Sequence, residues 1–221
     1  MLKKRMFFQK VCTKMALLSA IALLLTASSA FAISYPINVS DGFGSGPFAY
    51  VVLTDNGTNS VKVAVNMEPG YGLMSPGTNQ AFGFNLTDSV LAFTIADIST
   101  GFTYSGLSPG GNQWNFGYVG RYEYAFAGPG APGVVGSDAL TFTITATSGT
   151  LTLDSFAEGS INPPGSVSGF FGLHIWSAEA PSNANTFPAT NGPPQVPEPT
   201  SILLLGLGLV GLAVWRKKFI E

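Results

Sequence analysis

The chain has 221 residues, of which 46% are hydrophobic and 10% are charged, and its formal net charge is −2. Eight of its ten Lys and Arg residues lie in the first 14 or the last six positions. Residues 33–195 therefore carry ten acidic and two basic residues, a formal charge of −8. This charge argues against a nucleic-acid partner and against adsorption to anionic lipid. Because the single cysteine is Cys12, residues 33–195 cannot form a disulfide or a thiolate metal site.

The first 32 residues are typical of a signal peptide. Five basic residues within the first fourteen positions precede an apolar stretch from Met15 to Leu25, and Ala30-Phe31-Ala32 supplies an A-x-A cleavage site. Cleavage after Ala32 makes Ile33 the first residue of the mature protein. The sequence therefore predicts an exported protein from which the signal peptide, residues 1–32, is removed.

Residues 33–176 have the pattern of a β domain. Short β-rich segments alternate with clusters of Gly, Pro, Asn and Ser, and no long amphipathic helical pattern is present. Eight or nine strands with one apolar face each favour two packed antiparallel sheets. We therefore expect an all-β fold, a two-sheet antiparallel β-sandwich similar to a jelly roll. The expected strands are 48–54, 61–66, 81–86, 89–96, 115–119, 122–127, 140–147, 150–156 and 170–176.

Two hairpins are expected within this set. The first crosses residues 55–60, and the alternation of Val61, Val63 and Val65 with polar residues indicates one buried face on its second strand. The second is expected to turn at Ser148-Gly149. The oxygen-rich first turn also offers ligands to calcium, but it lacks the spacing of an EF-hand, and turn chemistry explains the same residues. No metal site is predicted.

An alternation of aromatic residues is the most suggestive pattern in the body. Rings occupy even positions from 114 to 126, interrupted at Gly120, where we expect a bend, bulge or turn. One interpretation is an exposed platform for sugar rings, with Trp114, Tyr118 and Tyr122 as candidate glycan contacts. The favoured interpretation is core packing, since aromatic residues commonly fill the space between sheets. The full set is Trp114, Phe116, Tyr118, Tyr122, Tyr124 and Phe126.

Catalytic chemistry has little support in the sequence. His174 is the only histidine, and no spacing pairs it with a nucleophile or a carboxylate. A glycan hydrolase needs two carboxyl groups across a cleft, and among ten acidic residues some pair can meet that requirement by chance. We therefore predict no catalytic residue and no cofactor, with an extracellular glycan hydrolase as a disfavoured alternative.

The C-terminal part changes character twice. Residues 177–195 are rich in Pro and small polar residues, which predicts a semi-rigid linker. The motif Pro197-Glu198-Pro199 follows in a segment that its prolines keep extended. Ile202 to Trp215 carries no charge and predicts a transmembrane segment of about 21 Å, short of a hydrocarbon core of about 30 Å. The basic cluster after this segment prefers the cytoplasmic side; it comprises Arg216, Lys217 and Lys218.

This tail, residues 196–221, resembles the PEP-CTERM sorting signal of Gram-negative bacteria in the order of its three parts. The resemblance implies recognition by an exosortase, a membrane-embedded thiol transpeptidase. It also implies transient insertion in the inner membrane, cleavage near Pro197-Glu198-Pro199 and delivery to the cell surface or extracellular matrix. Members often accompany exopolysaccharide production, so an association with exopolysaccharide or biofilm is expected. For the body, residues 33–176, we expect a non-enzymatic surface or matrix protein. The main alternative is a carbohydrate-binding module.

Overall fold

The computed structural model describes residues 31–40, 44–77, 79–107, 113–130, 134–135, 139–163, 168–177 and 186–191, which all belong to one compact unit, residues 31–199. Several predicted features lie outside the described residues. These are the signal peptide up to Ala30, the motif Pro197-Glu198-Pro199, the predicted span 202–215 and the basic cluster Arg216-Lys217-Lys218.

The described part of the protein is all-β, as the sequence predicts. Its only helical segments are two 3-10 turns, η2 (Gly117–Val119) and η3 (Leu153–Phe156). Within that part no helix is long and apolar enough to cross a membrane. The strands are β1 (Ala32–Ser40), β2 (Gly44–Asp55), β3 (Ser60–Met67), β4 (Tyr71–Leu73), β5 (Phe82–Phe84), β6 (Val90–Ala96), β7 (Thr103–Leu107), β8 (Trp114–Asn115), β9 (Arg121–Tyr122), β10 (Tyr124–Ala127), β11 (Val134–Val135), β12 (Leu140–Gly149), β13 (Phe171–Ser177) and β14 (Thr186–Asn191).

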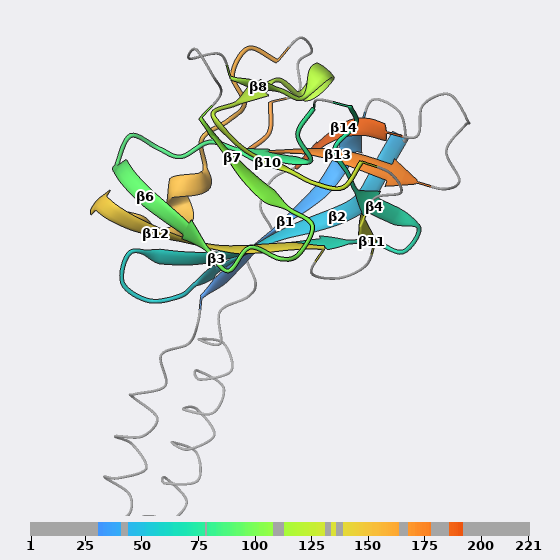
Figure 1. Cartoon of the computed structure of the whole chain (residues 1–221). Coiled ribbons are helices and arrows are strands. Elements are labelled where there is room, and N and C mark those ends of the chain that lie inside the picture. Colours follow the sequence, from blue (N-terminus) through green and yellow to red (C-terminus); the bar gives the residue numbers. More distant parts are fainter. Residues whose placement is uncertain are drawn as a thin grey trace, which may run out of the picture. The chain divides into compact units, whose positions relative to one another are not determined.

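Hydrogen bonds join twelve strands into one antiparallel sheet, which folds back on itself. Its order is β6-β12-β3-β2-β1-β14-β13-β5-β10-β7; β4 also pairs with β13, and β11 pairs with β4. β8 and β9 form a separate small hairpin (Figure 1). We expected two separate sheets, but β1 pairs with β2 on one side and with β14 on the other, so the ladder continues through it. A register shift between Ile37 and Val39 in β1 marks this passage, since bulges bend and twist strands.

Aromatic rings fill the space between the two halves of the folded sheet. Phe142 of β12 lies 4.3 Å from Phe126 of β10, measured between ring centroids, and also contacts Phe82 and Phe84 of β5. All four rings are fully buried. The same cluster includes the valines of β3 and Ala49, Val51 and Leu53 of β2. The sheet therefore closes over one continuous apolar core, which is the dominant stabilising contribution available to a body without disulfides.

The first predicted hairpin is confirmed and the second is wrong. β2 and β3 pair from Ala49↔Met67 to Asp55↔Val61, and Val61, Val63 and Val65 are buried as the alternation predicts. In contrast, β12 runs through Ser148 to Gly149 without turning, and residues 153–156 form η3 rather than a strand. Gly149 has φ of 85° and pairs with Val90, so the glycine ends β12 in a bulge against β6.

The predicted linker contains a strand. Residues 186–191 form β14, which pairs with β13 from Thr186 to Thr190 and with β1 from Ala189 to Asn191. The sequence did not predict this strand because it contains Pro188, and proline cannot donate to a ladder and is usually confined to edges. Among the described residues pairing with β1 begins at Ala189, so Pro188 is paired there with His174 of β13 alone. The described body thus extends beyond residue 176.

Candidate functional site

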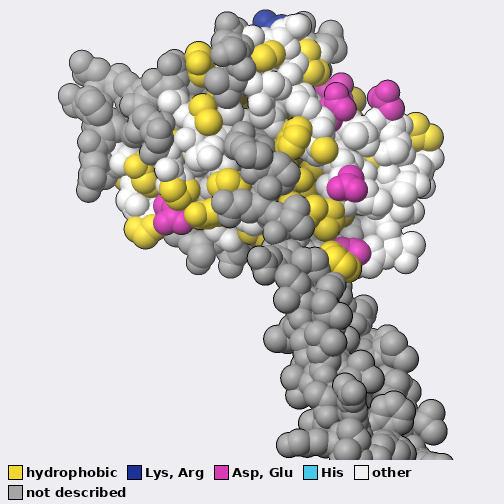
Figure 2. Space-filling view, turned by 180° about the vertical axis from the view of Figure 1, so that it is seen from behind, with side chains coloured by type: hydrophobic (Ala, Val, Ile, Leu, Met, Phe, Trp, Pro, Cys, Tyr) yellow, Lys and Arg dark blue, Asp and Glu magenta, His cyan; other side chains and the backbone are white. Residues whose placement is uncertain are grey.

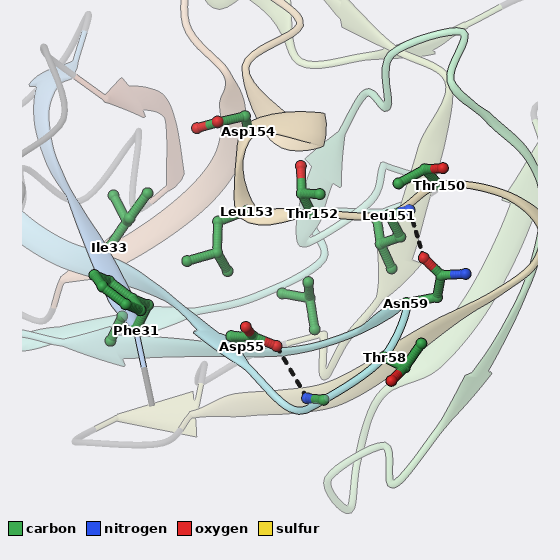
Figure 3. Close-up of a pocket in the computed structure, with 13 residues that line it drawn as sticks. Phe31, Ile33, Asp55, Thr58, Asn59, Thr150, Leu151, Thr152, Leu153 and Asp154 are labelled. Carbon is green, nitrogen blue, oxygen red and sulfur yellow. Dashed lines mark hydrogen bonds between the residues drawn. The ribbon is translucent and has the colours of Figure 1, made fainter. Parts of the chain in front are cut away.

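A surface pocket lies where the body begins, next to the predicted signal-peptide cleavage site. Its volume is about 670 Å³, and it is bounded by the start of β1, the β2–β3 turn and residues 150–154 (Figure 3). Ile33, Leu151 and Leu153 give it apolar walls, and Asp55 and Asp154 bring carboxylates from opposite sides. No local pattern in the sequence indicates this pocket, because its parts come from three separate segments, residues 31–33, 55–61 and 150–154.

Two polar side chains of this pocket, Asp55 and Asn59, take part in local structure. The Asp55 carboxylate accepts a hydrogen bond from the Gly57 N–H at 2.9 Å, and the side-chain oxygen of Asn59 faces the Leu151 N–H at 3.4 Å (Figure 3). These contacts support the turn interpretation of residues 55–60. Asp55 and Asp154 are both exposed. Among the described residues no cluster of three or more metal-ligating side chains occurs.

The aromatic alternation does not form one flat platform. β8 and β9 are a hairpin in which Trp114 faces Tyr122 across the ladder, with the turn η2 and Gly120, at φ of 103°, between them. Phe116 and Tyr122 are fully buried in a small second core, and Trp114 and Tyr118 pack against it and remain partly exposed. Of the three candidate glycan contacts, Tyr122 is thus placed inside the protein, where its hydroxyl donates to the Gly169 carbonyl oxygen at 3.1 Å. Burial raises its pKa.

Trp114 is held in place by its own hydrogen bond. Its indole N–H donates to the Gly106 carbonyl oxygen of β7 at 3.0 Å, and its side chain is partly buried. Tyr118 lies on η2 and is also partly buried. Within the predicted aromatic set, Trp114 and Tyr118 are the residues outside the main core that solvent reaches.

A pair of glycines makes room for the buried rings. Gly83 of β5 and Gly172 of β13 are opposite each other in the ladder, and Phe116 and Tyr122 lie against them. A Cβ added at Gly83 would come within 2.5 Å of Phe116 Cε2, and one added at Gly172 would overlap ring carbons of Tyr122. The glycines are therefore required by close approach of the rings rather than by backbone conformation.

We expect Gly172→Ala to destabilise the folded body by about 1–3 kcal/mol, because overpacking forces the Tyr122 ring out of its position. Urea unfolding followed by tryptophan fluorescence measures this loss. The matched control is Gly130→Ala, since an added Cβ there meets nothing within 4 Å. Equal stability of Gly172→Ala and Gly130→Ala would contradict this packing.

His174 belongs to the same small core. Its ring stacks on Phe116 with centroids 4.9 Å apart and planes at 18°, and its Nδ1 contacts the Gln80 carbonyl oxygen. Because a carbonyl only accepts, Nδ1 must carry the proton. Burial lowers the pKa of His174, and the hydrogen bond to Gln80 opposes part of that shift. With 5% of its surface exposed, this histidine is packed inside the protein.

Acidic side chains lie near one another beside β9 and β10. The pKa of Glu123 is raised by burial first and then by the negative charges of Asp88 and Glu158. The Glu123 backbone N–H donates to Asn85 Oδ1 at 2.7 Å, and the Asn85 amide donates to the Gly159 carbonyl oxygen at 2.8 Å, which ties the three segments together. Figure 2 shows acidic side chains spread over the described part of the face turned to the viewer, without a gathering of basic ones.

We expect Glu123→Gln to raise the melting temperature at pH 7. The corresponding gain in the free energy of unfolding is at most about 1 kcal/mol, because the group is partly exposed. A carboxyl whose pKa is raised by folding keeps its proton in the folded protein at a pH where the unfolded protein has lost it. Its contribution to stability therefore falls as pH rises above the ordinary value of 4.5. The difference between variant and wild type should shrink toward zero as pH falls to about 4.

Thermal unfolding monitored by circular dichroism over that pH range measures the effect. Glu68→Gln, which carries the same change of net charge outside this acidic group, is the control. A difference in melting temperature between Glu123→Gln and wild type that is the same at pH 7 and at low pH would contradict the raised pKa of Glu123.

Comparison with known proteins gives information about the tail alone. Residues 195–218 match a family model described as the PEP-CTERM protein-sorting motif. No curated protein matches the sequence, and no solved structure matches it.

Proposed function

We propose, from the PEP-CTERM protein-sorting motif at residues 195–218, that an exosortase cleaves this protein near Pro197-Glu198-Pro199 and delivers its β body to the cell surface or extracellular matrix. The motif implies a secreted protein with exosortase as its processing partner. The destination, an association with exopolysaccharide or biofilm, and a non-catalytic role for the body are the parts that we propose.

Each part of the tail has a physical role in this proposal. The prolines keep residues 197–199 extended, so that an enzyme groove can bind them. The uncharged segment 202–215 enters the inner membrane, and Arg216-Lys217-Lys218 stay on its cytoplasmic side. Because the segment spans about 21 Å of a core of about 30 Å, it is a marginal anchor, which suits a temporary stop.

The start of the folded body supports signal-peptide removal after Ala32. β1 begins at Ala32, and Ile33 pairs with Leu53 of β2. Cleavage at this point therefore leaves nearly the whole β1–β2 ladder in the mature protein. It removes the pairing of Ala32 with Thr54 and the hydrogen bond from the Asp55 N–H to the Phe31 carbonyl oxygen at 2.8 Å.

The surroundings of the side chains that could act in catalysis support a non-catalytic body. His174 is buried against Phe116 with its Nδ1 engaged, and the two carboxylates of the pocket, Asp55 and Asp154, are exposed. The glycan hydrolase alternative would use the pocket of Figure 3 and this pair of carboxylates. It predicts that purified protein releases reducing sugar from exopolysaccharide and that Asp154→Asn abolishes the release.

A second candidate function is glycan binding through Trp114 and Tyr118. Their partial exposure above the small core is the observation that favours it, since stacking of a sugar on an aromatic face needs solvent access. Trp114→Ala should then weaken retention of the protein on exopolysaccharide while leaving tail cleavage intact. Unchanged retention would remove this candidate.

The deciding experiment compares the protein in an exosortase-bearing host and in the same host without exosortase. We expect intact mass to show loss of the residues beyond about Pro197 only in the bearing host. The protein should move at the same time from the membrane fraction to the surface or medium. An uncut tail in both hosts would leave a plain membrane-anchored β protein and would overturn the proposal.

A further inference from the structure

Part of the wall of the pocket in Figure 3 belongs to the signal peptide. Phe31 and Ala32 line the pocket together with Ile33. Cleavage after Ala32 takes the first two residues away and leaves Ile33 at the edge of the pocket. The mature protein therefore has a new α-amino group at the place where the signal peptide was attached, next to a cavity of about 670 Å³.

The ladder between β1 and β2 fixes the position of this amino group. The Asp55 N–H donates to the Phe31 carbonyl oxygen at 2.8 Å, and Ile33 is paired with Leu53. Since hydrogen-bonded pairs alternate along an antiparallel ladder, Ile33 and Leu53 form the next such pair, and the Ile33 nitrogen points at the Leu53 carbonyl oxygen. An ammonium group at Ile33 keeps this bond and directs its other N–H bonds to the side where Ala32 lined the pocket.

Two carboxylates from different segments lie on this side. Asp55 stands opposite Phe31 in the ladder, so its side chain lies on the same face of the sheet as that of Ile33, two positions after Phe31. Asp154 belongs to η3. The pKa of Tyr35 is raised by burial first and then by the negative charge of Asp154, which places that carboxylate near the start of β1. Asp55 and Asp154 are the titratable side chains among the residues that line the pocket.

The body has few other cations that could pair with these carboxylates. Residues 33–195 contain ten acidic residues and only two basic ones, Lys62 and Arg121, and neither basic residue lines the pocket. An α-amino group has an ordinary pKa of about 7.7–8.0, so it is mostly protonated at neutral pH. Removal of the signal peptide therefore places a positive charge at the pocket that contains two of the negative ones.

We propose that the α-ammonium group of Ile33, created by removal of the signal peptide, binds in this pocket between Asp55 and Asp154 and anchors the start of β1. The pocket is then a binding site for the protein's own mature N-terminus, and the contact joins β1 to the end of β2 and to η3. In the precursor the Ile33 nitrogen is part of a peptide bond and carries no charge, so the anchor forms only after cleavage. This inference rests on the proposed cleavage after Ala32, but not on exosortase processing.

Asp154→Asn tests the anchor in the exported protein, purified in detergent from a host without exosortase. We expect its melting temperature, measured by circular dichroism at pH 6.5, to fall by about 2 °C, since ion pairs of exposed groups contribute little. The control is Asp97→Asn, which removes the same charge at an exposed position outside the pocket, where asparagine tolerates the positive φ. It should leave the melting temperature unchanged or raise it, because it relieves repulsion among residues with a formal charge of −8. The direction of the change thus separates a paired carboxylate from an unpaired one.

The contribution of the anchor to stability should depend on pH where the amino group titrates. A neighbouring carboxylate raises the pKa of the α-ammonium group, so the folded protein holds this proton more tightly than the unfolded protein does. The stabilisation is therefore complete from about pH 5 to pH 7.5 and is lost as pH rises through the raised pKa. The deficit of Asp154→Asn relative to wild type should disappear by about pH 10. Asp55→Asn should show the same pH dependence, because its amide oxygen can still accept from the Gly57 N–H.

A neutral N-terminus provides a second test of the same contact. Insertion of one glutamine between Ala32 and Ile33 gives a mature protein whose terminal glutamine cyclises to pyroglutamate with loss of ammonia, which removes the positive charge. Intact mass verifies both the cleavage and the cyclisation. In this background Asp154→Asn should no longer lower the melting temperature at pH 6.5, because the two changes remove the same interaction.

Intact mass also separates failure of the anchor from failure of the proposed processing. A mature protein that begins at a residue other than Ile33 would refute both the cleavage site and the anchor. If the protein begins at Ile33, equal melting temperatures of Asp154→Asn and Asp97→Asn at pH 6.5 would refute the anchor alone. The same conclusion would follow if the deficit of Asp154→Asn persisted at pH 10 or in the protein with the neutral N-terminus.

Discussion

Replacement of Glu198 by alanine should leave the protein with its C-terminal tail attached in a host that carries exosortase. Glu198 is the only charged residue between Glu179 and Arg216, so it is the one side chain of the motif able to form an ion pair with an enzyme groove. Loss of a charge-assisted hydrogen bond of ~1.4 kcal/mol or more slows processing about tenfold or more. Intact mass of the membrane and released fractions measures the effect.

The matched control is Glu179→Ala, which removes an acidic residue of the same charge upstream of the motif. Processing of that variant should match wild type. Deletion of Arg216 to Lys218 tests the topology separately, because it leaves Pro197-Glu198-Pro199 intact and removes the charges that hold the segment at the cytoplasmic side. Normal cleavage of both the Glu198→Ala variant and the deletion would refute the sorting mechanism.

Phe142→Ala should cost the folded body about 3–5 kcal/mol, the largest effect on stability that we expect from one side chain. Phe142 is fully buried and its ring contacts Phe82, Phe84 and Phe126 from the opposite half of the folded sheet. Its removal opens a cavity between the two halves. Since domains of this size are stable by about 5–15 kcal/mol, the variant should approach the limit of folding.

Urea unfolding of Phe142→Ala and Phe142→Leu gives a graded test, because leucine refills part of the cavity and should cost less. Leu107→Ala removes an apolar side chain that is 65% exposed, and should change stability by less than about 0.5 kcal/mol. A similar loss in Leu107→Ala and Phe142→Ala would show that the halves do not pack through Phe142.

The elements that the sequence predicted well are those in which local pattern and tertiary structure agree. β2 and β3 have an alternating apolar face and are joined by a turn rich in Asp, Asn and Gly, so both their pairing and their buried face were predictable. At Ser148-Gly149 the same turn chemistry occurs without a hairpin. There, β12 pairs with β3 and β6, and the glycine serves a bulge. Sequence alone does not distinguish these two uses of a positive φ.

The small core around Tyr122 shows a different limit. Even spacing predicts one shared face only for an unbroken strand, and η2 with Gly120 divides the aromatic run into the two arms of a hairpin. What then places Phe116 and Tyr122 is the pair Gly83 and Gly172, which lie more than 30 positions away in the sequence. No local pattern predicts that two glycines from other strands receive these rings.

The position of β14 links the folding of the body to the order of its synthesis. β14 lies between β1 and β13, and in the described sheet it is the hydrogen-bonded connection between the strands β6-β12-β3-β2-β1 and the strands β13-β5-β10-β7. A protein made from its N-terminus offers both groups before this strand exists. The sheet is therefore completed last at Asn191, only four residues before the matched motif begins at residue 195. During synthesis, the strand that completes the sheet and the sorting motif are therefore made almost at the same time. A product truncated before this strand lacks both.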